Sequence, residues 1–197
     1  MKKIVFALLF VSSIMTAQDM DVVKGDFKNL KGITEYNLTF DYSNLKVDKF
    51  DTEEAFLLDK MKKREEKGTD DDFKKSWFAD RENRYEPKFI ESFNKRFDKG
   101  EVKVGKDLTT AKYTMNVKTS WIYPGYNVGV MRQNAKIDVI ITIFETANPS
   151  NVLASIQYEK VPGNGAMGYD YNSGYRISES YAKLAKEIAT HIKKKAM

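Results

Sequence analysis

The sequence has no cysteine and only one histidine among its 197 residues. Without cysteine it can form no disulfide, no thiolate metal site and no cysteine nucleophile. One histidine cannot supply a typical zinc shell, so we expect no metal and no cofactor. The histidine, His191, precedes Lys193 to Lys195 in a predicted C-terminal helix, where a cation is favoured. No motif places it beside a serine nucleophile.

Long hydrophobic runs are also scarce. Lys2 and Lys3 are followed by an apolar run at 4–11 and then by small residues up to Ala17. The run is well short of the roughly 20 apolar residues that span a bilayer. We therefore predict that residues 1–17 are a signal peptide and that the mature chain has no transmembrane span. Because the chain has no cysteine, we also expect no lipid anchor. The alternative is a buried N-terminal helix.

Neither sign of charge dominates. The 33 basic and 28 acidic residues are interspersed, and removing Lys2 and Lys3 lowers the formal charge from +5 to +3. The basic cluster at 191–197 has the position of a solvated helix end. We expect no nucleic-acid partner.

Hydrophobic periodicity indicates strands and helices within one domain. Residues alternate between apolar and polar at 33–47, at 112–123 and at 135–144, and 152–161 follows a turn as a further strand. Tyr113, Met115, Val117, Thr119 and Trp121 share one face of that second segment. Helical spacing occurs at 86–97 and at 178–192.

We therefore predict an α+β fold, a two-layer sandwich with a mostly antiparallel sheet of about four strands and helices on one face. Residues 18–32 form a polar leader in this interpretation. Residues 33–197 form a single α+β domain with a helical insertion at about 51–84.

Motifs for catalysis are weak. Gly163, Gly165 and Gly168 have dinucleotide-site spacing but do not directly open a helix. The segment from Asp170 to Tyr181 has tyrosine at its sixth and twelfth positions, where a calcium-binding loop has glycine and glutamate. Two carboxylates suffice for a glycosidase, and 28 acids are present, so a polysaccharide hydrolase remains the alternative function.

Aromatic residues are concentrated in two loop segments. Trp121, Tyr123 and Tyr126 flank Pro124-Gly125, and a glycine-rich segment at 162–176 contains Tyr169, Tyr171 and Tyr175. Tyrosine and tryptophan are frequent in recognition surfaces because they offer a large contact area and a polar group. The same rings could instead cap the edge of the sheet. We take these six residues as the candidate binding site, with no catalytic residues.

The order of elements resembles a known group. An aromatic helix at 89–97, the segment Ala111 to Val117, the two strands at 135–145 and 152–161 and a final amphipathic helix follow one another. This order resembles the small periplasmic domains of bacterial envelope-assembly proteins, such as the lipopolysaccharide-assembly lipoprotein E group and the penicillin-binding-protein activator lipoproteins. The resemblance covers 85–195 and implies binding without catalysis. The lipid-bearing cysteine is absent, and 51–84 has no counterpart.

The Ala17-Gln18 junction resembles export signals of Bacteroidetes-type bacteria. The sequence thus predicts a periplasmic or secreted, non-enzymatic binding or assembly domain of the bacterial cell envelope. Its expected partner is an envelope protein or glycan that meets the aromatic loops. The oligomeric state is left open.

Overall fold

The computed structural model describes residues 20–97, 99–163 and 172–197. The predicted signal peptide therefore lies outside the described residues. The helices and strands are β1 (Met20–Gly25), η1 (Phe27–Leu30), β2 (Glu35–Asp41), β3 (Lys46–Val47), α1 (Glu53–Lys62), η2 (Glu65–Lys67), α2 (Asp70–Asp80), η3 (Arg81–Tyr85), α3 (Glu86–Asn94), β4 (Lys103–Gly105), β5 (Tyr113–Tyr123), β6 (Tyr126–Asn127), β7 (Arg132–Gln133), β8 (Ala135–Glu145), β9 (Asn148–Gly163) and α4 (Ser173–Lys195).

The fold is α+β, but the predicted mostly antiparallel sheet of about four strands is wrong. A mixed sheet of seven strands has the order β1-β9-β8-β5-β2-β4, and β3 also pairs with β5. Along this order β1, β9, β8 and β5 run antiparallel, each to the next. Strand β2 is parallel to both β5 and β4, and β3 is parallel to β5.

The parallel half of the sheet follows from the long helical connection. After β2 and the short β3 the chain passes through α1, α2 and α3, and it returns to the sheet as β4 and then β5. Two parallel neighbours need a crossover of this kind, whereas antiparallel neighbours can be joined by a short turn. Alternation of apolar and polar residues indicates which residues face the core, but it does not indicate which strands pair. The parallel half of the sheet was therefore not predicted from the sequence.

The segment before residue 33 contributes to the sheet and the core. Strand β1 pairs with β9, with a register shift between Val22 and Lys24. In η1, Phe27 and Leu30 are buried. Asp26 caps this short helix by accepting a hydrogen bond from the Lys28 backbone N–H at 2.8 Å.

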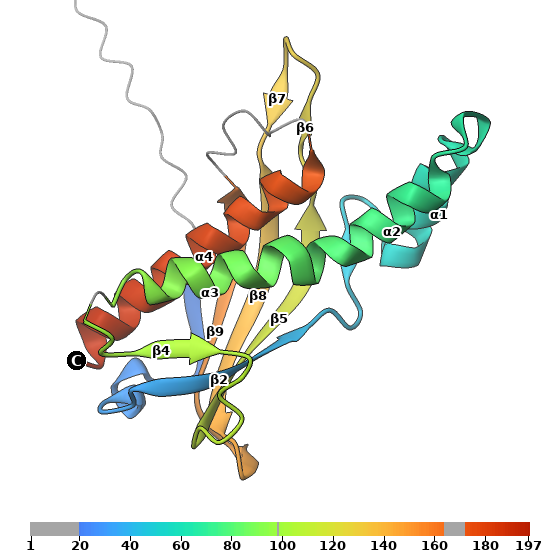
Figure 1. Ribbon diagram of the computed structural model, residues 1–197. Coiled ribbons are helices and arrows are strands. Elements are labelled where there is room, and N and C mark those ends of the chain that lie inside the picture. The colour runs from blue at the N-terminus through green and yellow to red at the C-terminus, as the bar shows by residue number, and fades with distance from the viewer. Residues whose placement is uncertain (1–19, 98, 164–171) are drawn as a thin grey trace, which may run out of the picture.

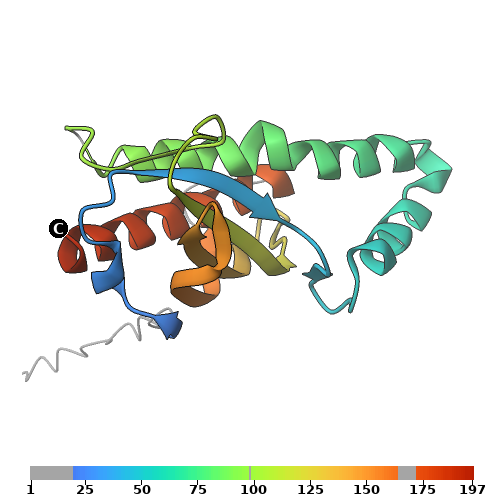
Figure 2. The ribbon, with the colours of Figure 1, turned by 90° about the horizontal axis from the view of Figure 1, so that it is seen from below.

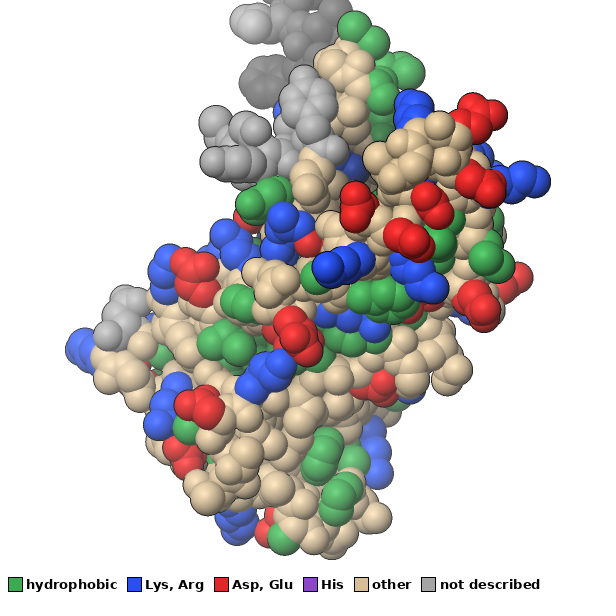
Figure 3. Space-filling view, turned by 45° about the vertical axis from the view of Figure 1, so that its right-hand side comes forward, with side chains coloured by type: hydrophobic (Ala, Val, Ile, Leu, Met, Phe, Trp, Pro, Cys, Tyr) green, Lys and Arg blue, Asp and Glu red, His purple; other side chains and the backbone are tan. Residues whose placement is uncertain are grey.

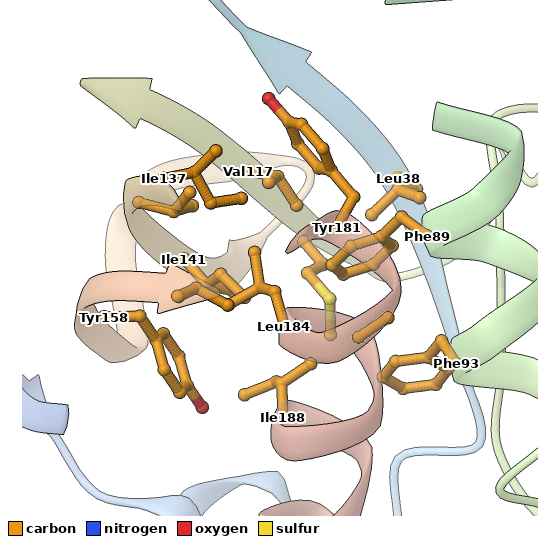
Figure 4. Close-up of a cluster of buried hydrophobic side chains, with 14 of the residues drawn as sticks. Leu38, Phe89, Phe93, Val117, Ile137, Ile141, Tyr158, Tyr181, Leu184 and Ile188 are labelled. Atoms are coloured by element: carbon orange, nitrogen blue, oxygen red, sulfur yellow. The ribbon is translucent and has the colours of Figure 1, made fainter. Parts of the chain in front are cut away.

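Helices α3 and α4 pack side by side on one face of the sheet (Figures 1 and 2). Their apolar faces point toward the strands, and the core lies between these two layers (Figure 4). Burying one large apolar side chain contributes about 1.5–3 kcal/mol. The fully buried residues at this interface include Leu38, Phe89, Phe93, Val117, Ile137, Ile141, Tyr158, Tyr181, Leu184 and Ile188.

A continuous helical run joins α2, η3 and α3. Its middle segment, η3, is a π-helix that directly precedes Pro87 in the first turn of α3. Proline lacks an N–H and clashes with the preceding turn, and a π-turn accommodates this without ending the helix. The run therefore continues where the sequence suggested a new helix, and α1 and α2 extend away from the sheet (Figures 1 and 2).

The surface carries no extended region of one charge on the face shown in Figure 3, where acidic and basic side chains alternate. This agrees with their interspersion in the sequence. Among the helices of the described residues, none combines the length and the apolar character needed to cross a membrane.

Candidate functional site

A small hairpin projects from one end of the sheet (Figure 1). It is formed by β6 and β7, in which Tyr126 pairs with Gln133 and Asn127 with Arg132. The chain enters it through Gly125, which has a φ of 63°. A Cβ at Gly125 would lie 2.4 Å from the Gln133 carbonyl oxygen, so the turn requires glycine.

The base of this hairpin is fixed by Arg176 of α4. This side chain is buried and donates through Nε to the carbonyl oxygen of Pro124 and through Nη2 to that of Gly125, both at 3.1 Å. Hydrogen bonds from a charged donor are stronger than neutral ones. Helix α4 therefore holds the turn between β5 and the hairpin, and the sequence did not single out Arg176.

Trp121 reaches the surface because β5 contains a bulge. The register with β8 shifts between Thr119 and Trp121, so Thr119 and Ile122 are buried while Trp121 turns away from the core. Strict alternation predicted that Trp121 shares one face of the strand with Thr119, and the extra residue, Ser120, places the two on opposite faces. The Trp121 Nε1 donates to the Asp48 carbonyl oxygen at 2.9 Å.

Trp121 and Tyr123 form one aromatic pair beside the hairpin. Their rings are stacked, with centroids 6.1 Å apart and planes inclined by 11°. The Lys160 ammonium nitrogen lies 3.6 Å from the Trp121 ring centroid, within cation–π range. The Tyr123 hydroxyl donates to Gln133 Oε1 at 2.5 Å and so links β5 to β7.

Of the other predicted tyrosines, Tyr126 lies in the hairpin and Tyr175 lies in α4. Tyr126 is half-buried in β6. Tyr175 lies in the first turn of α4, because Asn172 caps that helix and α4 begins at Ser173, before the predicted start at Ser178. Its ring lies 4.4 Å from the Arg84 guanidinium carbon. Tyr169 and Tyr171 lie outside the described residues.

The outermost part of the hairpin, residues 128–131, is here called the tip. Three apolar side chains of the tip are exposed, Val128 at 61%, Val130 at 92% and Met131 at 61%. A turn of this kind normally carries polar residues. The two valines and the methionine in this turn could have indicated an exposed apolar surface, but only the aromatic residues were considered from the sequence.

Three of the four backbone N–H groups of the tip have acceptors within the hairpin. The Val128 N–H donates to the Met131 carbonyl oxygen at 3.0 Å, and the Val130 N–H donates to the Val128 carbonyl oxygen at 3.1 Å. The Gly129 N–H donates to Asn127 Oδ1 at 2.9 Å. The tip is therefore a folded turn that presents apolar side chains outward.

A buried ion pair connects the helical run to α4 near the hairpin. Asp80 pairs with Arg84, and its Oδ2 would lie 2.0 Å from a Cβ added to Gly174, in the first turn of α4. A carboxylate is stabilised at a helix N-terminus. Burial raises the pKa of Asp80, and the Arg84 charge opposes that shift. These contacts give Asp80 a structural role in joining α2 to α4.

Titratable side chains elsewhere are dispersed. The described residues contain no group of three histidine, aspartate or glutamate side chains that could hold a metal ion. His191 lies near the other end of α4, where its ring packs 5.5 Å from that of Phe27 and its Nδ1 lies 3.4 Å from the Tyr158 hydroxyl. Burial lowers its pKa.

A search of protein-family models, of curated proteins and of solved structures finds no match for this chain. We call Trp121, Tyr123, Tyr126, Tyr175 and the tip together the hairpin end. Its polar groups, such as the Trp121 N–H, the Tyr123 hydroxyl and the Arg176 guanidinium, bond within the protein. What it presents outward is aromatic and apolar surface.

Proposed function

We propose that this protein is an exported, non-enzymatic binding domain that attaches to another component of the bacterial cell envelope through the hairpin end. The observation that carries the proposal is the exposure of Val128, Val130 and Met131 on a hairpin held by Arg176. Burying one such side chain completely is worth about 1.5–3 kcal/mol. The tip would therefore contribute several times that amount when it docks, without first having to be ordered.

Export is the part of the proposal that depends on the sequence alone. Lys2 and Lys3, the apolar run at 4–11 and the small residues before Gln18 support it. A binding role, rather than catalysis, is supported by the way in which the hairpin end uses its polar atoms internally. Rigid scaffolds that carry exposed apolar and aromatic loops are typical of recognition surfaces.

Site-specific photo-crosslinking in cells of the native organism tests this proposal. A photoreactive amino acid is placed at Val130 and, as a matched control, at Ser150. Both positions are exposed, and Ser150 lies near the start of β9, beside the turn that joins β8 to β9 at the end of these strands opposite the hairpin. We expect an envelope adduct from position 130 and none from position 150. Equal adducts from both positions, or none from either, would contradict the proposal.

A further inference from the structure

We propose that the tip binds the surface of a lipid bilayer that contains anionic lipids, with Val128, Val130 and Met131 entering the layer below the headgroups. This rests on the proposed function, because it names the envelope component that the hairpin end meets. The starting observation is that the tip projects beyond the sheet and exposes apolar side chains (Figure 1). A projecting turn with apolar side chains can enter the hydrocarbon layer of a membrane, which deforms around it.

The backbone of the tip is suited to that medium. Hydrocarbon cannot accept hydrogen bonds, so every N–H that enters it needs an acceptor within the protein. The N–H groups of Val128, Gly129 and Val130 all have one within the hairpin. The tip could therefore leave water without exposing these donors to hydrocarbon.

The order of side chains along the hairpin matches the layers of a bilayer surface. The apolar tip comes first, and Arg132 in β7 lies next to it, opposite Asn127. Tyr126 follows in β6, and Tyr123 and Lys136 pair at the base. Tyrosine is enriched at the level of lipid headgroups, where its ring is in apolar and its hydroxyl in polar surroundings. Basic side chains at that level attract anionic headgroups.

The local charge is complementary to an anionic surface. The sequence contains no aspartate or glutamate from Leu108 to Ile137, a stretch that includes the whole hairpin. Asp138, which follows it, is paired with Lys160 at 2.8 Å, and Asp80 is paired with Arg84. Asp48 lies beside Tyr123, whose pKa it raises together with burial. Lys136, which pairs with Tyr123 across β5 and β8, places a positive charge at the base of the hairpin.

Vesicle binding tests the inference with the purified protein. The probes are vesicles of phosphatidylethanolamine with phosphatidylglycerol, which is anionic, and vesicles of phosphatidylcholine alone. We expect the protein to sediment with the anionic vesicles, and Val130→Asp to weaken this at least about tenfold, since a charge enters hydrocarbon only at high cost. Leu58→Asp is the matched control, because Leu58 is 63% exposed on α1, away from the hairpin.

A second readout reports the depth of the tip directly. Val130→Trp should show a blue shift of its additional fluorescence with anionic vesicles and quenching by brominated acyl chains, and Leu58→Trp should show neither. Absence of vesicle binding by the unaltered protein, or equal binding by Val130→Asp, would overturn the inference.

The two proposals can fail separately. Protein adducts from position 130 in cells, without binding to pure vesicles, would identify a protein partner, overturn the lipid inference and leave the proposed function intact. Failure of both measurements would overturn both.

Discussion

Single residues at the hairpin end show how a sequence pattern can be reversed by one position. The alternation in the sequence predicted that Trp121 lies on the same face of β5 as Thr119, yet a register shift at Ser120 buries Thr119 and Ile122 and turns Trp121 away from the core. Bulges re-aim side chains in this way because they insert one unpaired residue into a strand. Nothing in the local sequence marks Ser120 as that residue, so the position of Trp121 had to come from the structure.

His191 gives a prediction at the residue scale. Burial and the charges of Lys195 and Lys194 lower its pKa in the folded protein, and Glu187 acts in the opposite direction. The unfolded chain therefore binds the proton more readily, and the free energy of unfolding should rise as pH increases from about 5 to about 7, around the usual histidine pKa of about 6.5.

Urea unfolding at several pH values measures this effect. His191→Gln should remove the rise, so that the difference in unfolding free energy between the natural protein and the variant grows with pH. Thr190→Ser, at an adjacent position, is the control and should keep the rise. A pH-independent difference for His191→Gln would contradict the prediction.

At the scale of elements, the hairpin owes its position to α4. The two hydrogen bonds from Arg176 hold the turn at Pro124 and Gly125. Lysine keeps the charge of arginine but not its planar fork of donors. Arg176→Lys should therefore lower the free energy of unfolding by about 1–3 kcal/mol, the range for a hydrogen bond to a charged group.

Chemical denaturation with hydrogen exchange checks the Arg176 prediction. Exchange of the amides in β6 and β7 should accelerate in Arg176→Lys. The matched control is Arg96→Lys, since Arg96 is exposed and substitutions there should stay within about 0.5 kcal/mol. Unchanged stability and unchanged exchange in the hairpin would show that Arg176 does not hold it.

Elements with strong periodicity were predicted well, and those defined by tertiary contacts were not. The antiparallel pairing of β8 with β9 was predicted from the apolar segment at 135–144 and the strand at 152–161, and it is confirmed. The predicted turn at 148–151 is wrong, because β9 already begins at Asn148. Strands β3 and β4 have two and three residues, too few to show a period. The parallel pairing of β2 depends on where the helical run returns the chain, which no local pattern records.

The candidate site was predicted in part. The segment around Pro124-Gly125 was singled out because aromatic residues flank a turn, and the structure places Trp121, Tyr123 and Tyr126 together there. Arg176 and the tip were missed. The role of Arg176 depends on its contact with the turn at Pro124 and Gly125, which are about 50 residues away in the sequence, so the sequence alone does not show it.

For the whole molecule, the mixed sheet and its two helices form a rigid base with the hairpin at one end (Figures 1 and 2). The core between the layers is filled by large buried side chains (Figure 4). Substitutions in the exposed tip should therefore leave the fold intact. Such substitutions should weaken attachment of the protein to the envelope without lowering its free energy of unfolding. The proposed function can therefore be measured directly.

The measurement is cosedimentation of the purified protein with the total envelope fraction of the native organism. Three forms are compared: the natural protein, the tip variant Val128→Ser/Val130→Ser/Met131→Ser, and Leu58→Ser as an equally exposed apolar control. We expect the tip variant to lose at least about tenfold in affinity, since each factor of ten is about 1.4 kcal/mol, and Leu58→Ser to bind like the natural protein. Equal binding by all three forms would show that the hairpin end is not the surface through which this protein attaches.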